Sequence, residues 1–270
     1  MTLHEIQRPP TRVPGYAAPA TTAAAVELLN RHRERARVIA GGTDLVVELD
    51  RGSHSGVELL VDISAITESA AIIETDEGTI RLGAGVTHNQ VVANELCRDR
   101  LLPLAQACLE IGSPQLRNRA TVVGNVVTAS PANDTISALM ALDASVELTS
   151  VDGVRIVAID DFFTGFRTTV IEPNELVTAL IISGLGDDER GVFVKAGLRR
   201  AQAISVVHLA VVVGLDDGGQ VTRVRAALGS VAPTVIDVPG LADALVGGSL
   251  DAEAAARGRE LAVAASSPID

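Results

Sequence analysis

The stretch RVIAGGTDLVVEL, residues 37–49, places two adjacent glycines between a short apolar run and an amphipathic one. The apolar run predicts a buried strand, and the residues after the glycines predict a helix with Thr43 or Asp44 at its N-cap. A strand that enters a helix through Gly41-Gly42 leaves backbone N–H groups at the helix start without partners. Because glycine has no Cβ, an anion can approach these groups closely. The pattern therefore indicates either a phosphate-binding loop or an ordinary turn with a Thr/Asp cap.

The composition limits the classes of function that the chain can have. It has 270 residues, 47% of them hydrophobic, with 22 Lys+Arg against 34 Asp+Glu and a formal charge of −12. A surface this acidic repels nucleic acid, and aromatic residues that could stack on bases make up only 2%. The sequence shows neither an apolar run of about 20 residues nor a secretory signal. A disulfide between Cys97 and Cys108 is possible but unneeded in a core of this size, so we expect a cytoplasmic location.

The cysteines and histidines are too few and too scattered to predict a metal centre. Cys97 and Cys108 both lie in a region with helical spacing, and an iron–sulfur cluster normally takes more thiolates than these two. The five histidines form no HxH or HxxxH pair. Any redox centre in this chain is therefore expected to be organic, and no metal site is predicted.

Helical and strand patterns alternate along the chain without regular βαβ spacing, which predicts an α+β fold. Hairpin turns are expected at residues 76–78 and 152–153, where Asp and Gly separate apolar runs. The pattern of residues along the sequence changes near residues 170–190, which predicts a domain break there.

A second glycine-containing stretch, RATVVGNVVTASPAND, covers residues 119–134. Gly124-Asn125 predicts another tight turn, flanked by the hydroxyls of Thr121 and Thr128. Thr121 could donate to a phosphate oxygen, and Asp134 could accept from a ribose or ribityl hydroxyl or serve only as a helix cap. Two such turns could hold a diphosphate from two sides.

The site is not predicted to be of the Rossmann type. That fingerprint requires G-x-G-x-x-G at a strand-to-helix turn, and neither glycine stretch has it. Gly83-Ala84-Gly85 is the nearest match, but it follows a hairpin strand and is interpreted as a turn. His88, just after it, is expected to be structural rather than a proton shuttle.

Five motifs in order carry a resemblance to a known family. They are AGGTDL (40–45), PQLRNRATVVGN (114–125), TASPANDT (128–135), DFFTGFR (161–167) and FVKAGLRRAQAIS (193–205). Together they resemble the FAD-binding medium subunit of molybdenum hydroxylases, the xanthine dehydrogenase and carbon monoxide dehydrogenase group. The resemblance covers residues 10–265.

The resemblance implies an FAD-binding domain of the vanillyl-alcohol-oxidase (PCMH) type over residues 1–170, in two lobes that divide near residue 65. It implies a smaller C-terminal α+β domain of the CO-dehydrogenase-flavoprotein type over residues 171–270. FAD is the implied cofactor. The molybdenum cofactor and the [2Fe–2S] clusters are implied on partner subunits, a molybdenum-binding large subunit and a [2Fe–2S] small subunit, in a dimer of heterotrimers.

The resemblance also implies which residues hold FAD. The first loop is Val38, Ile39, Ala40, Gly41, Gly42, Thr43, Asp44 and Leu45, and the second contributes Thr121, Val123, Gly124 and Asn125, with Thr128 beside them. Asp134 matches a carboxylate that contacts the polyol chain, Ile111 and Val177 match apolar residues near the cofactor, and Lys195 matches a basic residue near the flavin. The family usually has glycine where this chain has Val123, so a Cβ there is expected to shift the turn or displace the phosphate.

The implied function is that of an electron outlet, which takes electrons from the [2Fe–2S] clusters and passes them to NAD+, oxygen or another acceptor. No group of residues suited to general-base catalysis stands out, so no catalytic residue is predicted. Lys195, Arg199 and Arg200 form a basic cluster that could face the flavin edge or a nicotinamide phosphate, or belong to a salt-bridged surface loop. Two alternatives stay open: a stand-alone flavin oxidoreductase of the same fold, and an assembly subunit that has lost its flavin.

Overall fold

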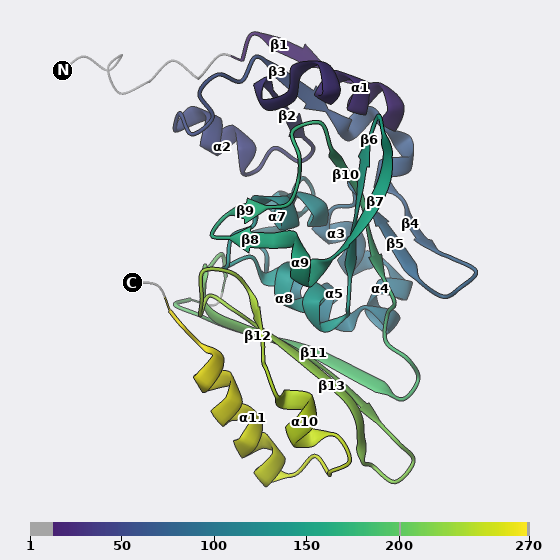
Figure 1. Cartoon of the computed structure of the whole chain (residues 1–270), viewed down its shortest axis with the longest axis vertical. Coiled ribbons are helices and arrows are strands. Elements are labelled where there is room, and N and C mark those ends of the chain that lie inside the picture. The colour runs from purple at the N-terminus through teal and green to yellow at the C-terminus, as the bar shows by residue number, and fades with distance from the viewer. Residues whose placement is uncertain (1–12, 200, 269–270) are drawn as a thin grey trace, which may run out of the picture.

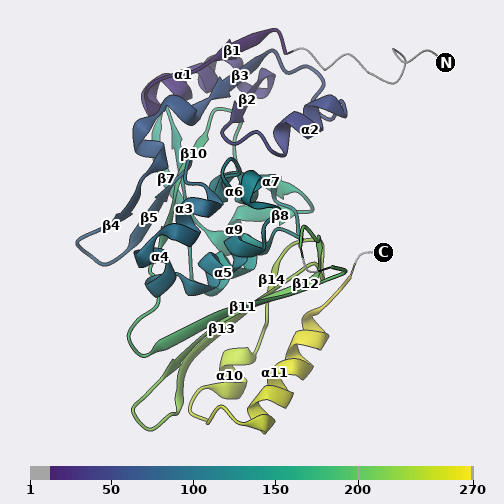
Figure 2. The same ribbon diagram turned by 180° about the vertical axis from the view of Figure 1, so that it is seen from behind.

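The structure is a computed structural model that describes residues 13–199 and 201–268. Three layers follow one another along the long axis of the molecule (Figures 1 and 2). A small parallel sheet with its helices forms one end, an antiparallel sheet with a group of helices forms the middle, and a second antiparallel sheet with two helices forms the other end. The predicted mixture of helices and strands is confirmed.

The N-terminal layer is built on parallel strands in the order β1-β3-β2. Thr21 caps the first helix by accepting a hydrogen bond from Ala24 N at 3.2 Å. The first glycine loop leaves the carboxyl end of β2. The elements are β1 (Gly15–Ala17), α1 (Thr22–His32), β2 (Ala36–Ile39), α2 (Leu45–Asp50) and β3 (Leu59–Asp62), with short 3-10 helices at Arg33–Arg35, Ile63–Ala65 and Thr67–Ala70.

The central layer is an antiparallel sheet in the order β4-β5-β10-β6-β7. Both expected hairpin turns are confirmed, and Gly78 (φ +77°) and Gly153 (φ +136°) supply their left-handed backbone. The strands are β4 (Ile72–Glu74), β5 (Ile80–Gly83), β6 (Ser145–Ser150), β7 (Gly153–Ala158) and β10 (Leu176–Ile182). The helices are α3 (His88–Ala93), α4 (Glu95–Arg100), α5 (Leu102–Glu110), α6 (Pro114–Arg117), α7 (Val122–Thr128), α8 (Asp134–Ala141) and α9 (Ile159–Phe162), and a small ribbon is formed by β8 (Phe163–Gly165) and β9 (Thr168–Thr169).

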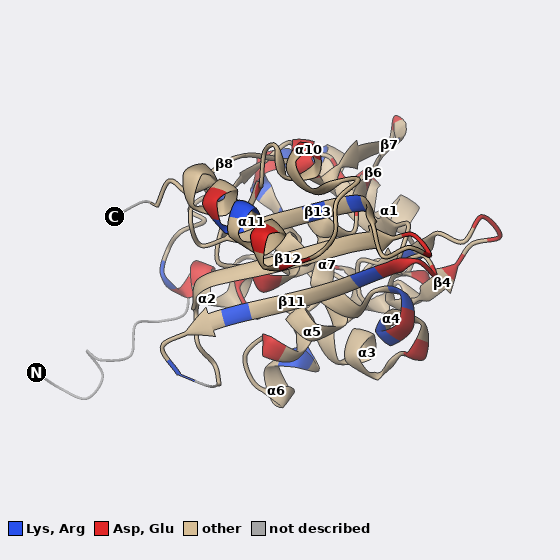
Figure 3. Ribbon diagram, turned by 90° about the horizontal axis from the view of Figure 1, so that it is seen from below, with Lys and Arg blue, Asp and Glu red and all other residues tan. Residues whose placement is uncertain are grey.

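The C-terminal layer is an antiparallel sheet in the order β11-β12-β13-β14. One face packs on α5 and α8 of the central layer, and the other carries the C-terminal helices (Figure 3). The alternation of buried and half-buried residues along β12 follows from this two-sided packing. The elements are β11 (Glu189–Gly197), β12 (Ser205–Leu215), β13 (Val221–Gly229), β14 (Ile236–Asp237), α10 (Leu241–Leu245) and α11 (Ala252–Ala265).

The C-terminal sheet shares the main hydrophobic core with the layers before it. Phe193, Ala210, Val212 and Ala227 belong to that core, whereas a second cluster lies between β13 and the helices α10 and α11. Strand β10 pairs with both β5 and β6, so the central sheet is completed only by residues after 170. The division into residues 1–170 and 171–270, with a split near 65, stays a prediction.

Candidate functional site

The two glycine stretches, which are about 80 residues apart in the chain, touch each other. A Cβ placed on Gly41 would lie 2.0 Å from the carbonyl oxygen of Arg119 and 3.0 Å from Ala120 Cα. Only glycine fits there, because backbone atoms cannot yield as a flexible side chain does. The structure therefore brings the two predicted loops together at one seam between the N-terminal and central layers.

The first loop presents a run of backbone N–H groups. Among the described residues, the amides of Gly41, Gly42, Thr43 and Asp44 donate no hydrogen bond, and the first donor after them is Val46 N to Gly42 O at 3.1 Å. Gly42 adopts a φ of +73°, a left-handed conformation that favours glycine. Asp44 occupies the N-cap position of α2 but its side chain caps nothing. This backbone suits an anion such as a diphosphate.

The predicted tight turn at Gly124-Asn125 is wrong. Both residues lie in helix α7, whose N-cap Thr121 accepts a hydrogen bond from Gly124 N at 3.0 Å and whose next amide, Asn125 N, bonds to Thr121 O at 3.0 Å. Threonine is a strong N-cap, and it starts a helix where the sequence suggests a turn. Thr121 is 5% exposed and Thr128 donates back to Gly124 O at 2.9 Å, so both hydroxyls serve the helix itself.

The open side of α7 is at Gly124. Apart from the backbone of α7 itself, a Cβ there would meet only the Thr121 hydroxyl, at 2.8 Å, so no other segment covers this side of the helix. Val123, which replaces the usual family glycine, is 5% exposed and packs in the main core. Its side chain is therefore accommodated in the interior.

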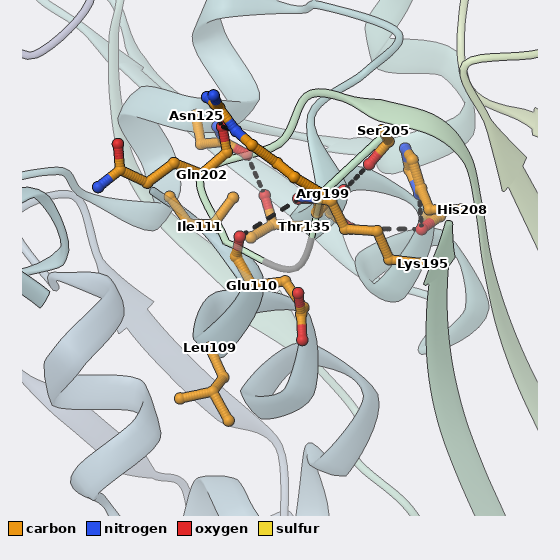
Figure 4. Close-up of polar contacts among 12 residues, drawn as sticks. Leu109, Glu110, Ile111, Asn125, Thr135, Lys195, Arg199, Gln202, Ser205 and His208 are labelled. Atoms are coloured by element: carbon orange, nitrogen blue, oxygen red, sulfur yellow. Dashed lines mark hydrogen bonds and ion pairs between the residues drawn. The ribbon is translucent and has the colours of Figure 1, made fainter. Parts of the chain in front are cut away.

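Asn125 is fixed by residues of the next segment. Thr135 Oγ1 donates to Asn125 Oδ1 at 2.5 Å, and Asn133 Nδ2 donates to the Asn125 carbonyl at 2.6 Å. Figure 4 shows Asn125 and Thr135 joined in this way, with Gln202 and Arg199 of the β11–β12 connection drawn nearby. The side-chain amide is thus oriented before any ligand binds.

Asp134 lies in the first turn of α8 and is 3% exposed. Its carboxylate accepts from Lys195 Nζ at 2.6 Å and from Ser205 Oγ at 2.5 Å. The Lys195 side chain is 8% exposed, so this is a buried ion pair between the central layer and β11. Asp134 and Lys195, both predicted as site residues, are therefore brought into direct contact.

The remaining predicted residues lie in other elements and are buried to different degrees. Ile111 follows α5 and is half-buried, with its carbonyl accepting from Arg117 Nη1 at 3.0 Å. Val177 is buried within β10, a strand that packs against α7. Val38 and Ile39 end β2, and Leu45 begins α2.

Lys195 and Arg199 of the basic cluster lie in different environments. Lys195 pairs with Asp134 inside the protein, whereas Arg199 donates to the carbonyl of Gln202 at 2.7 Å within its own loop. Arg200 lies outside the described residues. The DFFTGFR motif contacts helix α2, which follows the first loop, through Arg167, whose Nη1 lies 3.4 Å from Glu48.

His88 and the two cysteines lie in the interior. His88 is fully buried, its Nδ1 lies 3.3 Å from Cys108 Sγ, and Nε2 has no partner among the described residues. Burial and the nearby Arg117 lower the pKa of His88 to about 4, so it is neutral at pH 7. Burial raises the pKa of the Cys97 thiol to about 11, and both cysteines are free thiols. In the described part of the chain, no three His, Cys, Asp or Glu side chains gather as metal ligands would.

Several polar residues of the site were missed by sequence analysis. Ser205 and His208 on β12, and Asn133, Thr135 and Ser137 around the start of α8, are polar groups whose hydrogen bonds join these segments. His208, inside an otherwise apolar strand, was the one sequence feature that pointed to these contacts. A polar side chain buried in this way requires a hydrogen-bond partner.

Comparison with known proteins defines the class. Residues 9–182 match the family model for the FAD binding domain in molybdopterin dehydrogenase, and residues 193–270 match that for the CO dehydrogenase flavoprotein C-terminal domain. The chain therefore belongs to the family of FAD-binding subunits of molybdenum hydroxylases, which are oxidoreductase flavoproteins.

Individual relatives support the same class. The chain is 37% identical over 212 residues to the nicotinate dehydrogenase FAD-subunit of Eubacterium barkeri, covering 77% of this chain and 71% of that one. It is 30% identical over 255 residues to the carbon monoxide dehydrogenase medium chain of Hydrogenophaga pseudoflava, covering 94% and 88%. A solved structure of carbon monoxide dehydrogenase from that organism matches with a TM-score of 0.91 at 30% identity, covering 97% of this chain and 90% of the matched one.

The residues present fit the FAD of this family. The amides of Gly41–Asp44, which donate no hydrogen bond, suit a diphosphate, and the first loop that carries them contacts Arg119 and Ala120, just before α7. No helix in the described residues is long and apolar enough to cross a bilayer.

Proposed function

We propose that this chain is the FAD-carrying medium subunit of a molybdenum-containing hydroxylase or dehydrogenase. It takes electrons from [2Fe–2S] clusters of a partner subunit and passes them to NAD+ or another acceptor. The observation that carries the proposal is the contact of Gly41 with Arg119, which holds the first loop, with its four unpaired amides, against the segment that leads into α7. In this proposal, the FAD-binding domain is of the vanillyl-alcohol-oxidase (PCMH) type.

The proposed FAD site runs along the seam. The diphosphate binds to the Gly41–Asp44 amides and reaches the open side of Gly124. The flavin half extends towards Asn125, Asp134 and Lys195, with Ile111 as an apolar neighbour. Val177 contributes to the buried wall behind α7.

FAD, when bound, supplies the chemistry of accepting electrons singly and releasing them as a hydride pair. The chain's own residues bind and orient it. The first loop offers backbone donors without a side chain between them and the ligand, and α8 and β11 hold the polar groups in place through the Lys195–Asp134 pair. Because this pair carries one charge of each sign, the net charge of the buried region between α8 and β11 stays close to zero.

The proposed partners are a molybdenum-binding large subunit and a [2Fe–2S] small subunit, assembled in the cytoplasm as a dimer of heterotrimers. Support comes from relatives that are named as medium chains or medium subunits, including the nicotine 6-hydroxylase medium subunit of Paenarthrobacter nicotinovorans. The acidic composition of the chain also argues against a nucleic-acid partner.

The test is purification of the native complex followed by its absorption spectrum and metal analysis. We expect one FAD for each copy of this chain, with molybdenum and [2Fe–2S] signals on co-purifying subunits. Addition of the complex's reducing substrate should bleach the flavin bands. A chain that purifies alone and oxidises an organic substrate without partners would contradict the proposal and favour the stand-alone flavin enzyme.

A further inference from the structure

A short segment, Pro131–Ser137, lies between the candidate site and the C-terminal sheet. On the site side, Asn133 and Thr135 hold the carbonyl and the side-chain amide of Asn125 at 2.6 and 2.5 Å. These are the contacts that orient Asn125 in the first turn of α7. Whatever fixes this segment therefore helps to fix the position of Asn125.

On its other side, the segment is held by side chains and backbone of the C-terminal sheet. Lys195 and Ser205 bind the carboxylate of Asp134. The Pro131 carbonyl accepts from Ser230 N at 2.9 Å and lies 3.4 Å from His208 Nε2. His208 Nδ1 lies 2.8 Å from Ser137 Oγ. His208 therefore bridges the two ends of the segment, and Figure 4 shows it beside Ser205 and Lys195.

The tautomer of His208 follows from its two partners. The Pro131 carbonyl can only accept, so Nε2 carries the proton of the neutral ring, and Nδ1 accepts from the Ser137 hydroxyl. His208 is 1% exposed, and its burial lowers the pKa of the imidazole, which keeps it neutral. The charged groups that act on it are Asp134 and Lys195, which oppose each other.

The ring is also packed closely by two neighbouring strands. A Cβ on Gly229 of the neighbouring strand β13 would lie 1.9 Å from His208 Nε2, so the imidazole packs directly on a glycine backbone. Phe193 of β11 lies against it on another side, with 5.7 Å between the ring centroids. The C-terminal sheet thus presents a rigid polar anchor to the Pro131–Ser137 segment.

We propose that His208 is a positioning residue for FAD binding, through which the C-terminal sheet holds Pro131–Ser137 and thereby orients Asn125. The inference rests on the proposed function, since FAD is the ligand whose site is being shaped. His208, a residue of the C-terminal domain, thus shapes the nucleotide site without touching the nucleotide.

The test uses the full-length chain with FAD removed and compares His208→Ala, His208→Asn and Ser137→Ala with the control Val212→Ala. Asparagine places a polar atom near the position of Nδ1 and keeps the contact with Ser137. Val212 is fully buried on the same strand but belongs only to the apolar core, so its truncation lowers stability without touching the segment. Each variant is measured for the FAD dissociation constant, the melting temperature and amide hydrogen exchange over residues 125–137.

We expect His208→Ala and Ser137→Ala to weaken FAD binding about tenfold or more. Loss of a residue that orients a metal ligand by a hydrogen bond has an effect of this size on metal affinity. Both alanine variants should also speed exchange over residues 125–137 in the FAD-free chain. His208→Asn, which keeps the Ser137 contact and loses the one to Pro131, should lose less FAD affinity than His208→Ala, and Val212→Ala should melt earlier with an unchanged dissociation constant. If His208→Ala does not fold, Ser137→Ala, which leaves only a small void, decides the result.

Unchanged exchange and unchanged FAD affinity in both alanine variants would overturn the proposal, and so would an equal loss of affinity in Val212→Ala. A wild-type chain that binds no FAD would overturn the proposed function instead. In that case, faster exchange in the His208 and Ser137 variants would still show the mechanical link to Asn125.

Discussion

Lys195 Nζ lies 2.6 Å from Asp134 Oδ2, and the two side chains are 8% and 4% exposed. Removing one member of a buried pair leaves an uncompensated charge, which typically costs about 3–5 kcal/mol. We expect Lys195→Met to lower the free energy of unfolding by about this amount in urea titrations of the FAD-free chain. The double variant Lys195→Met/Asp134→Asn should lose clearly less than the sum of the single losses.

The exposed pair Arg31–Glu27 provides the control, with side chains 66% and 60% exposed. Arg31→Met should change the free energy of unfolding by less than about 0.5 kcal/mol, because water already solvates both charges. Additive losses at positions 195 and 134 would contradict the interpretation that the two buried groups stabilise each other.

Gly41 is expected to be intolerant of any side chain. A Cβ there overlaps the Arg119 carbonyl, so Gly41→Ala must push the two loops apart. We predict that Gly41→Ala purifies with little or no FAD, as measured by the ratio of flavin to protein absorbance. Gly78→Ala is the matched control: it sits in a hairpin turn at φ +77° with nothing within 4 Å, so it should cost stability and keep full FAD content.

Thr121 is expected to act as a helix cap. Its Oγ1 accepts from Gly124 N at 3.0 Å, and loss of such a cap typically costs about 1 kcal/mol. Thr121→Ala should therefore lower the free energy of unfolding by about that amount even without FAD, and Thr121→Ser should restore it. A Thr121→Ala variant with wild-type stability and reduced FAD affinity would instead support the phosphate contact suggested by the sequence.

His88 predicts a specific pH dependence of stability. Its pKa is lowered from 6.5 to about 4 in the folded chain, so between these values the unfolded state binds more protons. The free energy of unfolding therefore falls as the pH drops through this window, by about 3 kcal/mol from this residue alone.

The measurement for His88 is urea unfolding at several pH values from 7 to 4.5, compared with His88→Leu. Leucine fills a similar volume and cannot titrate, so the variant should show a flatter decline of stability with falling pH. Parallel curves for the two proteins would mean that His88 is protonated equally easily in both states, contrary to its full burial.

Local patterns predicted much of the fold. The strand, Gly-Gly loop and helix around residues 37–49 and the hairpins at Gly78 and Gly153 are confirmed, because turn chemistry and hydrophobic period act over a few residues. Gly124 was misjudged because a Thr121 cap and a Gly-Asn turn compete for the same residues, and packing of valines against the core favours the helix.

The links across the site could not be predicted from local patterns. Ser205 and His208 meet the start of α8 from 71 residues away, and nothing in an apolar strand indicates which distant group its histidine will contact. Similarly, the fit of Val123 depends on which way its side chain points in a helix that the sequence did not indicate. The contacts of Ser205 and His208 arise from the packing of the C-terminal sheet on α5 and α8.

The most direct test of the central claim is an experimental map of this chain with FAD bound. We predict diphosphate oxygens within hydrogen-bond distance, about 3 Å, of backbone amides between Gly41 and Asp44, with the open side of Gly124 facing them. A map in which the diphosphate lies away from the Gly41–Arg119 seam, with those amides bonded only to water or protein, would contradict the account.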